Sequence, residues 1–133
     1  MGYNYQEADI NIRKTSNFQT KKYQILISQA MTKDELKNML WYLHNTTFRN
    51  EKQIQNSKQC GCFHCGRIFP AETVTEWCDE SENEDKTALC PFCMIDSVLG
   101  DASWVNITDQ LMTLMNIEFF GEGIDSVDIK FNE

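Results

Sequence analysis

Cys60-Gly-Cys62-Phe-His-Cys65-Gly-Arg67 and Leu89-Cys90-Pro-Phe-Cys93 are the two short stretches that decide the fold of this chain. Each contains a Cys-x-x-Cys pair, and the 24 residues 66–89 separate the two pairs. Two residues between cysteines let both sulfurs reach one metal ion from a single tight turn, and two such turns supply a tetrahedral zinc site. The spacing therefore predicts one structural Zn²⁺, bound by Cys62, Cys65, Cys90 and Cys93. Cys60 in place of Cys62, or His64 in place of a thiolate, is the alternative ligand.

The size and composition indicate a globular protein that does not span a membrane. The chain has 133 residues, 41% hydrophobic and 24% charged, and no run approaches the ~18 apolar residues of a membrane helix. The N-terminus has no basic stretch followed by an apolar core, and Gln6 excludes a myristoylation signal. Six cysteines without a secretion signal favour metal binding in a reducing cytoplasm over disulfides.

We expect a single domain, 1–133, of the α+β class. Its predicted parts are a β-hairpin plus helix at 1–49, a connector at 50–59, a zinc module at 60–103, and a helix plus terminal strand at 104–133. Alternating apolar residues predict strands at Ala8–Ile12 and Lys22–Ser28, paired as an antiparallel hairpin. Alternation at Ile124–Phe131 predicts a last strand that joins this hairpin in one small sheet.

Two longer helices are predicted from capping signals and helical spacing. Thr32-Lys-Asp-Glu35 is a capping box, and it begins a helix at 33–46 with Leu36, Met39, Leu40 and Leu43 inward. Trp41 and Phe48 widen its apolar stripe, and His44 lies at the boundary of that stripe rather than on a metal. Thr108 caps a second helix with Leu111, Leu114, Met115 and Phe119 inward, and Gly121 and Gly123 end it.

Between these helices the signals are shorter. Residues 49–59 are polar and read as a connector or a frayed extension of the first helix. Pro70 suits the first position of a short helix at 69–77, with Val74 and Trp77 on one face, and Thr87–Leu89 suits a brief strand. Met94 follows Cys93 where the first pair has Gly66. This difference favours a helix from the second pair to Leu99, ended by Gly100, hence a treble-clef-like module; a zinc-ribbon-like module with two equivalent turns is the alternative.

Charge is distributed unevenly along the chain. Residues 1–59 hold nine Lys or Arg and five Asp or Glu (+4), whereas residues 60–133 hold three and fifteen (−12), which together give −8. The acidic half repels phosphate backbones and attracts basic proteins, although acidity can also serve solubility alone. The candidate partner-binding residues are Glu80, Glu82, Glu84, Asp85, Asp125 and Asp128, the last two facing Lys21 and Lys22 or solvent.

Three segments together carry a resemblance to a known family. Cys60–Cys65, Thr87–Cys93 and Ile95–Ser103 resemble a family of small bacterial cytoplasmic proteins in which paired cysteines precede an Ile-Asp-Ser-Val stretch. The likeness covers roughly residues 50–120 and implies a cytoplasmic zinc protein without implying an activity. Met94 departs from the glycine expected there, and the hairpin and last strand lie outside the likeness.

Enzymatic activity is not expected. A closed four-thiolate site has no position at which to activate water, so its zinc should supply folding energy. Helix-surface and turn-capping roles explain Asp96, Asp101 and Ser103, and Cys78 is expected to be a buried thiol. There is no phosphate loop, dinucleotide fingerprint or nucleophile elbow, and a redox role would need one pair in a βαβ setting.

Two binding functions remain. The leading hypothesis is a zinc-stabilised acidic interaction module that inhibits a basic protein partner, as an immunity protein or a phage inhibitor of a nucleic-acid-handling enzyme does. The alternative is a nucleic-acid-binding regulator that uses the basic half, with phosphate contacts and base stacking from Lys14, Lys21, Lys22, Tyr23, Lys33, Lys37, Trp41 and Arg49. The oligomeric state does not follow from the sequence.

Overall fold

The computed structural model describes residues 10–14, 23–27 and 32–131. Helices and small sheets together make an α+β fold, as the sequence predicts. The helices are α1 (Lys33–Asn45), α2 (Glu51–Gln55) and α3 (Asp109–Phe120). The strands are β1 (Ile10–Lys14), β2 (Tyr23–Ile27), β3 (Gln59–Cys62), β4 (Ile68–Pro70), β5 (Trp77–Cys78), β6 (Thr87–Ala88), β7 (Val98–Gly100) and β8 (Asp128–Phe131). The 3-10 turns among the described residues are η2 (Ala71–Thr73), η3 (Asp101–Ser103) and η4 (Ile124–Ser126).

The sheet at one end of the molecule has the order β1-β2-β8. β1 pairs antiparallel with β2, with Ile10 opposite Ile27, and β8 pairs parallel with β2 on its other edge. The predicted hairpin and the return of the last strand to it are therefore confirmed. The last strand is shorter than predicted, because η4 occupies residues 124–126. Ala8, Lys21 and Lys22 lie outside the described residues.

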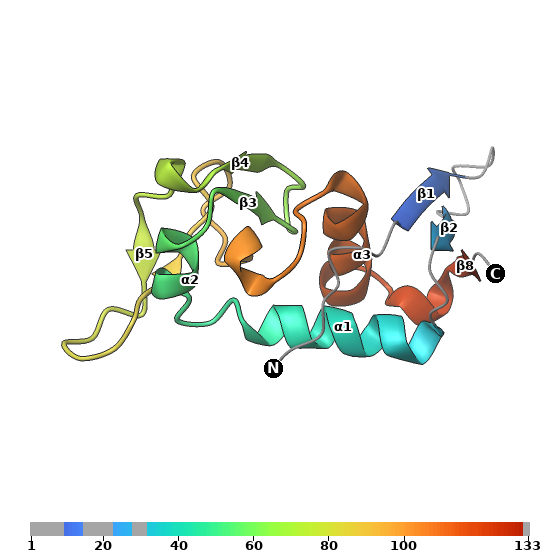
Figure 1. Cartoon of the computed structure of the whole chain (residues 1–133), viewed down its shortest axis with the longest axis horizontal. Helices are drawn as coiled ribbons and strands as arrows, with labels where there is room; N and C mark the ends of the chain where they lie inside the picture. Colours follow the sequence, from blue (N-terminus) through green and yellow to red (C-terminus); the bar gives the residue numbers. More distant parts are fainter. Residues whose placement is uncertain (1–9, 15–22, 28–31, 132–133) are drawn as a thin grey trace.

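Helix α1 runs along the long axis of the molecule, from the end that holds β8 past α3, and a short segment then leads to α2 (Figure 1). Its predicted capping box is present: Glu35 N donates to the Thr32 hydroxyl at 3.1 Å, and Thr32 N donates to the Glu35 carboxylate at 2.8 Å. The predicted inward residues Leu36, Met39, Leu40 and Leu43 are all buried. The capping signal and the apolar spacing therefore define this helix correctly.

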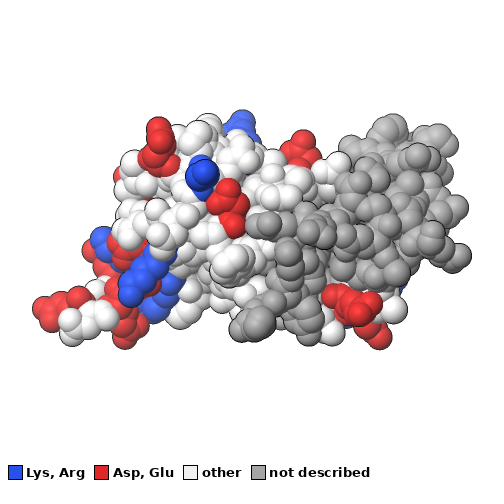
Figure 2. Space-filling view, in the orientation of Figure 1, with Lys and Arg blue, Asp and Glu red and all other residues white. Residues whose placement is uncertain are grey.

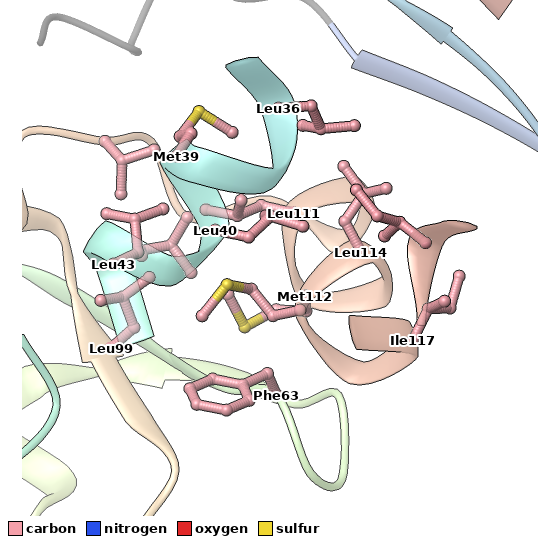
Figure 3. Packing of buried hydrophobic residues seen from close by; sticks show 14 of the residues in the cluster. Leu36, Met39, Leu40, Leu43, Phe63, Leu99, Leu111, Met112, Leu114 and Ile117 are labelled. Carbon is pink, nitrogen blue, oxygen red and sulfur yellow. The ribbon is translucent and has the colours of Figure 1, made fainter. Parts of the chain in front are cut away.

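The main core lies between α1 and α3 (Figure 3). α3 begins at its predicted cap, where the Thr108 hydroxyl accepts from Leu111 N at 3.1 Å. Three of its predicted inward residues are fully buried, and Phe119 is half-buried against the same cluster. Trp41 and Phe48 were predicted to widen the apolar stripe of α1, but they are 46% and 64% exposed. Phe48 lies beyond the last residue of α1, so the helical spacing that placed it in the stripe does not apply.

The connector predicted at 50–59 is an ordered part of the fold. It contains α2, buries Ile54, and leads into β3. The buried Asn50 side chain fastens its start, because its amide donates to Val98 O at 2.9 Å and accepts from Ala88 N at 2.9 Å. Periodicity missed α2 because its polar residues satisfy distant backbone groups instead of forming an apolar face.

The short helix predicted at 69–77 is wrong. β4 pairs with β3 in this region, Gln59 lying opposite Pro70, and η2 and then β5 follow. Pro70 has φ −62° and ψ 144°, an extended conformation that its ring permits equally well. The strand predicted at 87–89 is confirmed as β6, which pairs with β5. Val74 and Trp77 still pack on one cluster, although no helix aligns them.

A second hydrophobic cluster surrounds the cysteine turns. The order β4-β3-β7 places β3 in the middle of its sheet. Successive residues along β7 and at the end of β3 face the two clusters alternately. Cys62 and Val98 enter the second cluster, whereas Leu99 and Phe63, the residue after β3, enter the first. The strands that carry the first cysteine pair therefore also complete the core between the helices.

Candidate metal centre

Four sulfur atoms from the two cysteine pairs converge at one point. The Sγ atoms of Cys62, Cys65, Cys90 and Cys93 all lie within 4.8 Å of one another. Those of Cys62 and Cys93 are 3.6 Å apart, and those of Cys65 and Cys90 are 3.8 Å apart. A tetrahedral ion with zinc–sulfur bonds of about 2.3 Å needs sulfur separations of about 3.8 Å. The four side chains thus fit one tetrahedral metal ion, and they are the four that the sequence predicts.

The two turns that present these sulfurs have the same backbone geometry. In the first, Gly66 N donates to Cys62 O at 2.7 Å, and Cys62 N donates to Arg67 O at 2.9 Å. In the second, Met94 N donates to Cys90 O at 2.9 Å, and Cys90 N donates to Ile95 O at 2.9 Å. Gly66 and Met94 occupy equivalent positions with φ 83° and φ 65°.

The helix predicted from the second pair to Leu99 is therefore wrong. Residues 91–93 form a turn, and the segment continues into β7, which pairs with β3. Met94 adopts a left-handed conformation although it is not glycine, because the sulfur cluster and the pairing of β7 constrain the chain on both sides. The feature on which the treble-clef expectation depended is not present.

Hydrogen bonds to sulfur prepare the turns for thiolates. The Sγ of Cys90 accepts from Phe92 N at 3.3 Å and from Cys93 N at 3.5 Å. Burial alone would raise the pKa of Cys90, but these amides and the neighbouring thiols outweigh burial and lower it. Burial raises the pKa of Cys62 to about 12, despite the Ser97 hydroxyl 3.2 Å from its sulfur. A bound cation must therefore displace a proton from this thiol.

The alternative ligands lie outside the sulfur cluster. Cys60 is buried on β3 opposite Phe69, and burial together with Asp101 raises its pKa to about 12. His64 is exposed, and its ring packs edge-on against Phe120 with centroids 4.8 Å apart. Cys78 is half-buried instead of fully buried as predicted, and burial and then the charges of Asp79 and Asp96 raise its pKa.

Asp96, Asp101 and Ser103, which cluster in the sequence, do not form a catalytic group. The Asp101 carboxylate accepts from Lys58 N at 2.9 Å and from Gln59 N at 3.2 Å, so it caps a turn. The Ser103 hydroxyl donates to Gly100 O at 2.6 Å within η3. Asp96 is exposed and makes no hydrogen bond or ion pair with a described residue. Of these three side chains, the Asp96 carboxylate alone is free to bind a ligand.

The predicted acidic surface divides into two parts. Glu80, Glu82, Glu84 and Asp85 lie on the loop between β5 and β6, whereas Asp125 and Asp128 lie near β8 at the other end (Figure 1). Figure 2 shows acidic side chains gathered on the projecting loop, with Lys and Arg side chains next to them. These six residues therefore do not form one continuous patch.

Sequence reasoning missed one surface feature. A hollow of about 490 Å³ opens between the end of α1, the first cysteine turn and the end of α3. We call it the aromatic groove, and its lining is His44, Asn45, Thr47, Phe48, Phe63, Asp96, Ser97 and Phe120. Phe48, an apolar residue beyond the end of α1, could have indicated this hollow in the sequence. Its helical spacing from the residues of α1 led instead to its prediction as part of the apolar stripe.

No family model, curated protein or solved structure matches this chain. Within the described residues, none of the helices combines the length and the apolar character needed to cross a membrane.

Proposed function

We propose that this protein is a zinc-stabilised, acidic interaction module that binds a basic protein partner and inhibits or neutralises it. The proposal includes zinc as the metal, held in a ribbon-like module, and a reducing cytoplasm that keeps the cysteines as thiols. Four thiolates suit zinc, although iron accepts the same set. They fill the coordination shell of a tetrahedral ion, so the metal would stabilise the fold and not bind substrate.

The observation that carries the proposal is the way in which the acidic loop is held. The Arg49 guanidinium donates to Asp79 O at 3.0 Å and to Asp85 O at 2.9 Å, and it pairs with Glu84 at 3.1 Å. The Thr87 hydroxyl donates to the Asp79 carboxylate at 2.8 Å at the base of the loop. Glu80 and Glu82 remain exposed and make no ion pair with a described residue. A loop that is ordered before binding loses less entropy when a partner docks.

The nucleic-acid alternative is weakened by the contacts of the basic half. Lys37 pairs with Asp125 at 2.8 Å, Arg49 holds the acidic loop, and the Trp41 indole donates to Glu118 at 2.7 Å. Three of the groups that would contact phosphates or bases are thus engaged within the chain. The side chains of Lys14, Lys21, Lys22 and Tyr23 lie outside the part that the structure describes.

The proposal is tested by capture on the immobilised, zinc-loaded protein. Proteins from an extract of the native host should bind at low salt, be basic, and elute at about 0.5 M salt, where exposed charges are screened. The paired substitution Glu80→Lys and Glu82→Lys should abolish capture. Glu72→Lys with Glu76→Lys makes the same charge change at exposed positions outside the loop and should retain it.

Three outcomes would reject the proposal. The first is the absence of any partner that binds in a salt-sensitive way. The second is equal loss with both paired variants, which would indicate unspecific attraction. The third is retardation of DNA or RNA in a gel at low salt, which would favour the nucleic-acid alternative.

A further inference from the structure

The aromatic groove is built on the metal centre. Phe63 directly follows the ligand Cys62, and its N–H donates to Ser97 O at 3.1 Å. The Ser97 hydroxyl lies 3.2 Å from the Cys62 sulfur. Phe63 and Ser97 both line the groove, and Phe63 is fully buried beneath it. The shape of the groove therefore depends on the turn that the metal would hold.

Exposed rings form the sides of the groove. Phe48, beyond the end of α1, and Phe120, at the end of α3, are 64% and 48% exposed. The rings of Phe63 and Phe120 lie 5.9 Å apart. An exposed ring at the rim of a hollow offers its electron-rich face to a cation.

Among the described residues of the lining, Asp96 is the one carboxylate. Asp96 is exposed and pairs with no cation among the described residues, whereas Asp125 and Glu84 are each paired with a basic side chain. Aromatic faces and an unpaired carboxylate together favour a cation over a neutral or acidic group.

Within the described part of the chain, guanidinium groups already lie over phenyl rings. The Arg49 guanidinium lies 5.3 Å from the centre of the Phe48 ring, and the Arg67 guanidinium lies 4.8 Å from that of Phe92. Arg49 is also held by Glu84 and by loop carbonyls, so it is fixed outside the groove lining.

We propose that the aromatic groove receives an arginine side chain of the basic partner, stacked on the exposed Phe120 ring with its guanidinium on Asp96. A planar guanidinium can stack on a ring and still donate two hydrogen bonds to a carboxylate, which an ammonium group cannot do. This inference rests on the proposed function and adds a second contact beside the acidic loop. The hollow of about 490 Å³ has room for one side chain and its adjoining backbone.

The test is an NMR titration of the zinc-loaded full chain with N-acetyl-arginine amide. We expect shifts of the Thr47, Ser97 and Phe120 amide signals, with a dissociation constant of about 1–10 mM. N-acetyl-norleucine amide, a neutral ligand of similar length, should leave these signals unchanged, and N-acetyl-lysine amide should bind more weakly. Asp96→Asn and Phe120→Ala should each weaken arginine binding about two- to fivefold. Asp109→Asn and Trp104→Ala, at exposed positions outside the groove, should not.

Equal binding of the norleucine amide, equal or tighter binding of the lysine amide, or an unchanged affinity in Asp96→Asn would overturn the assignment. Capture from the host extract separates this failure from that of the proposed function. If Asp96→Asn captures the partner as the wild type does while the loop variant loses it, the interaction module stands and the arginine site fails. If arginine amide fills the groove but no basic protein is captured, the arginine site remains without the proposed function.

Discussion

Met94 and Gly66 occupy the same place in two equivalent cysteine turns, yet only one of them is glycine. Both have positive φ, which costs a residue with a Cβ atom about 1–2 kcal/mol. A Cβ atom at Gly66 would meet no atom within 4 Å, so conformation alone should set the cost of a substitution there. The Met94 side chain is 48% exposed beside the second turn. The strain at Met94 is thus not repaid by burial of its side chain.

This comparison gives the first prediction. Gly66→Ala should destabilise the zinc-loaded protein by about 1 kcal/mol, because alanine resists positive φ. Met94→Gly should stabilise it by up to about 1 kcal/mol, reduced by the greater freedom of glycine in the unfolded chain. Urea unfolding followed by circular dichroism measures both. Stabilisation by Gly66→Ala would mean that the turns are not equivalent in solution.

The second prediction concerns the metal ligands. Cys90→Ser should reduce the metal content below one zinc per chain and destabilise the fold by at least about 3 kcal/mol, since structural zinc contributes on the order of 10 kcal/mol. Elemental analysis and thermal melting provide the measurements. Cys78→Ser is the control, because Cys78 lies outside the sulfur cluster. Iron in the wild type, or an unchanged melting curve for Cys90→Ser, would contradict the zinc assignment.

At the scale of elements, polar contacts join α1 to η4 and the segment that follows α1 to β6. Near its N-terminus, Lys37 pairs with Asp125 of η4 at 2.8 Å. Shortly after its C-terminus, Arg49 N donates to the Thr87 hydroxyl of β6 at 2.8 Å. In each contact the two residues lie far apart in the sequence, and each contact fixes a short element.

The third prediction follows from the pair between α1 and η4. The hydrogen bond and charge of Lys37 lower the pKa of Asp125 and, reciprocally, Asp125 raises the pKa of Lys37. The stabilisation from Asp125 is therefore present above the unfolded pKa of about 3.9, and it is lost as the pH falls through the lowered folded value. Lys37→Met should return the pKa of Asp125 towards its ordinary value. Carboxyl NMR titration measures this shift, and Lys52→Met on α2 is the control. An unchanged Asp125 titration in Lys37→Met would show that the pair does not persist in solution.

At the scale of the whole molecule, the segment that carries the cysteine turns also contributes side chains to the main core between α1 and α3. Phe63 of the first cysteine turn and Leu99 of β7 are buried among the residues of α1 and α3 (Figure 3). Loss of the metal would free the first cysteine turn, and Phe63 is part of that turn. The two clusters should therefore lose their order together.

The fourth prediction tests this coupling. Removal of the metal by a chelator should lower the melting temperature by more than 10 °C, on the basis that about 1 kcal/mol corresponds to a few degrees in a domain of this size. The signals of Leu40 and Leu114, far from the sulfurs in sequence, should broaden together with those of Val98. Added zinc should restore them. Persistence of native helix-core signals in the metal-free protein would show that the two clusters are independent.

Much of the site and part of the fold could be predicted from local patterns. The four ligands follow from the spacing of the cysteines, because the geometry of a two-residue turn around a metal is the same in any fold. α1 and α3 follow from Thr32 and Thr108 and from apolar residues at helical spacing, since a cap and a stripe act within one helix. The strands of the hairpin follow from alternation.

Tertiary contacts decided the rest. Whether residues 94–99 form a helix or a strand depended on pairing with β3, which lies more than thirty residues earlier in the chain. Asn50, Arg49 and Asp101 each bond to backbone groups far away in sequence, so periodicity could not reveal their roles. The aromatic groove likewise exists only where the ends of α1 and α3 meet the first cysteine turn. The sequence alone determined which atoms can hold the metal, because ligand spacing is a local property. The tertiary structure decided what surrounds that metal, because strand pairing and surface shape are set by residues that meet only after folding.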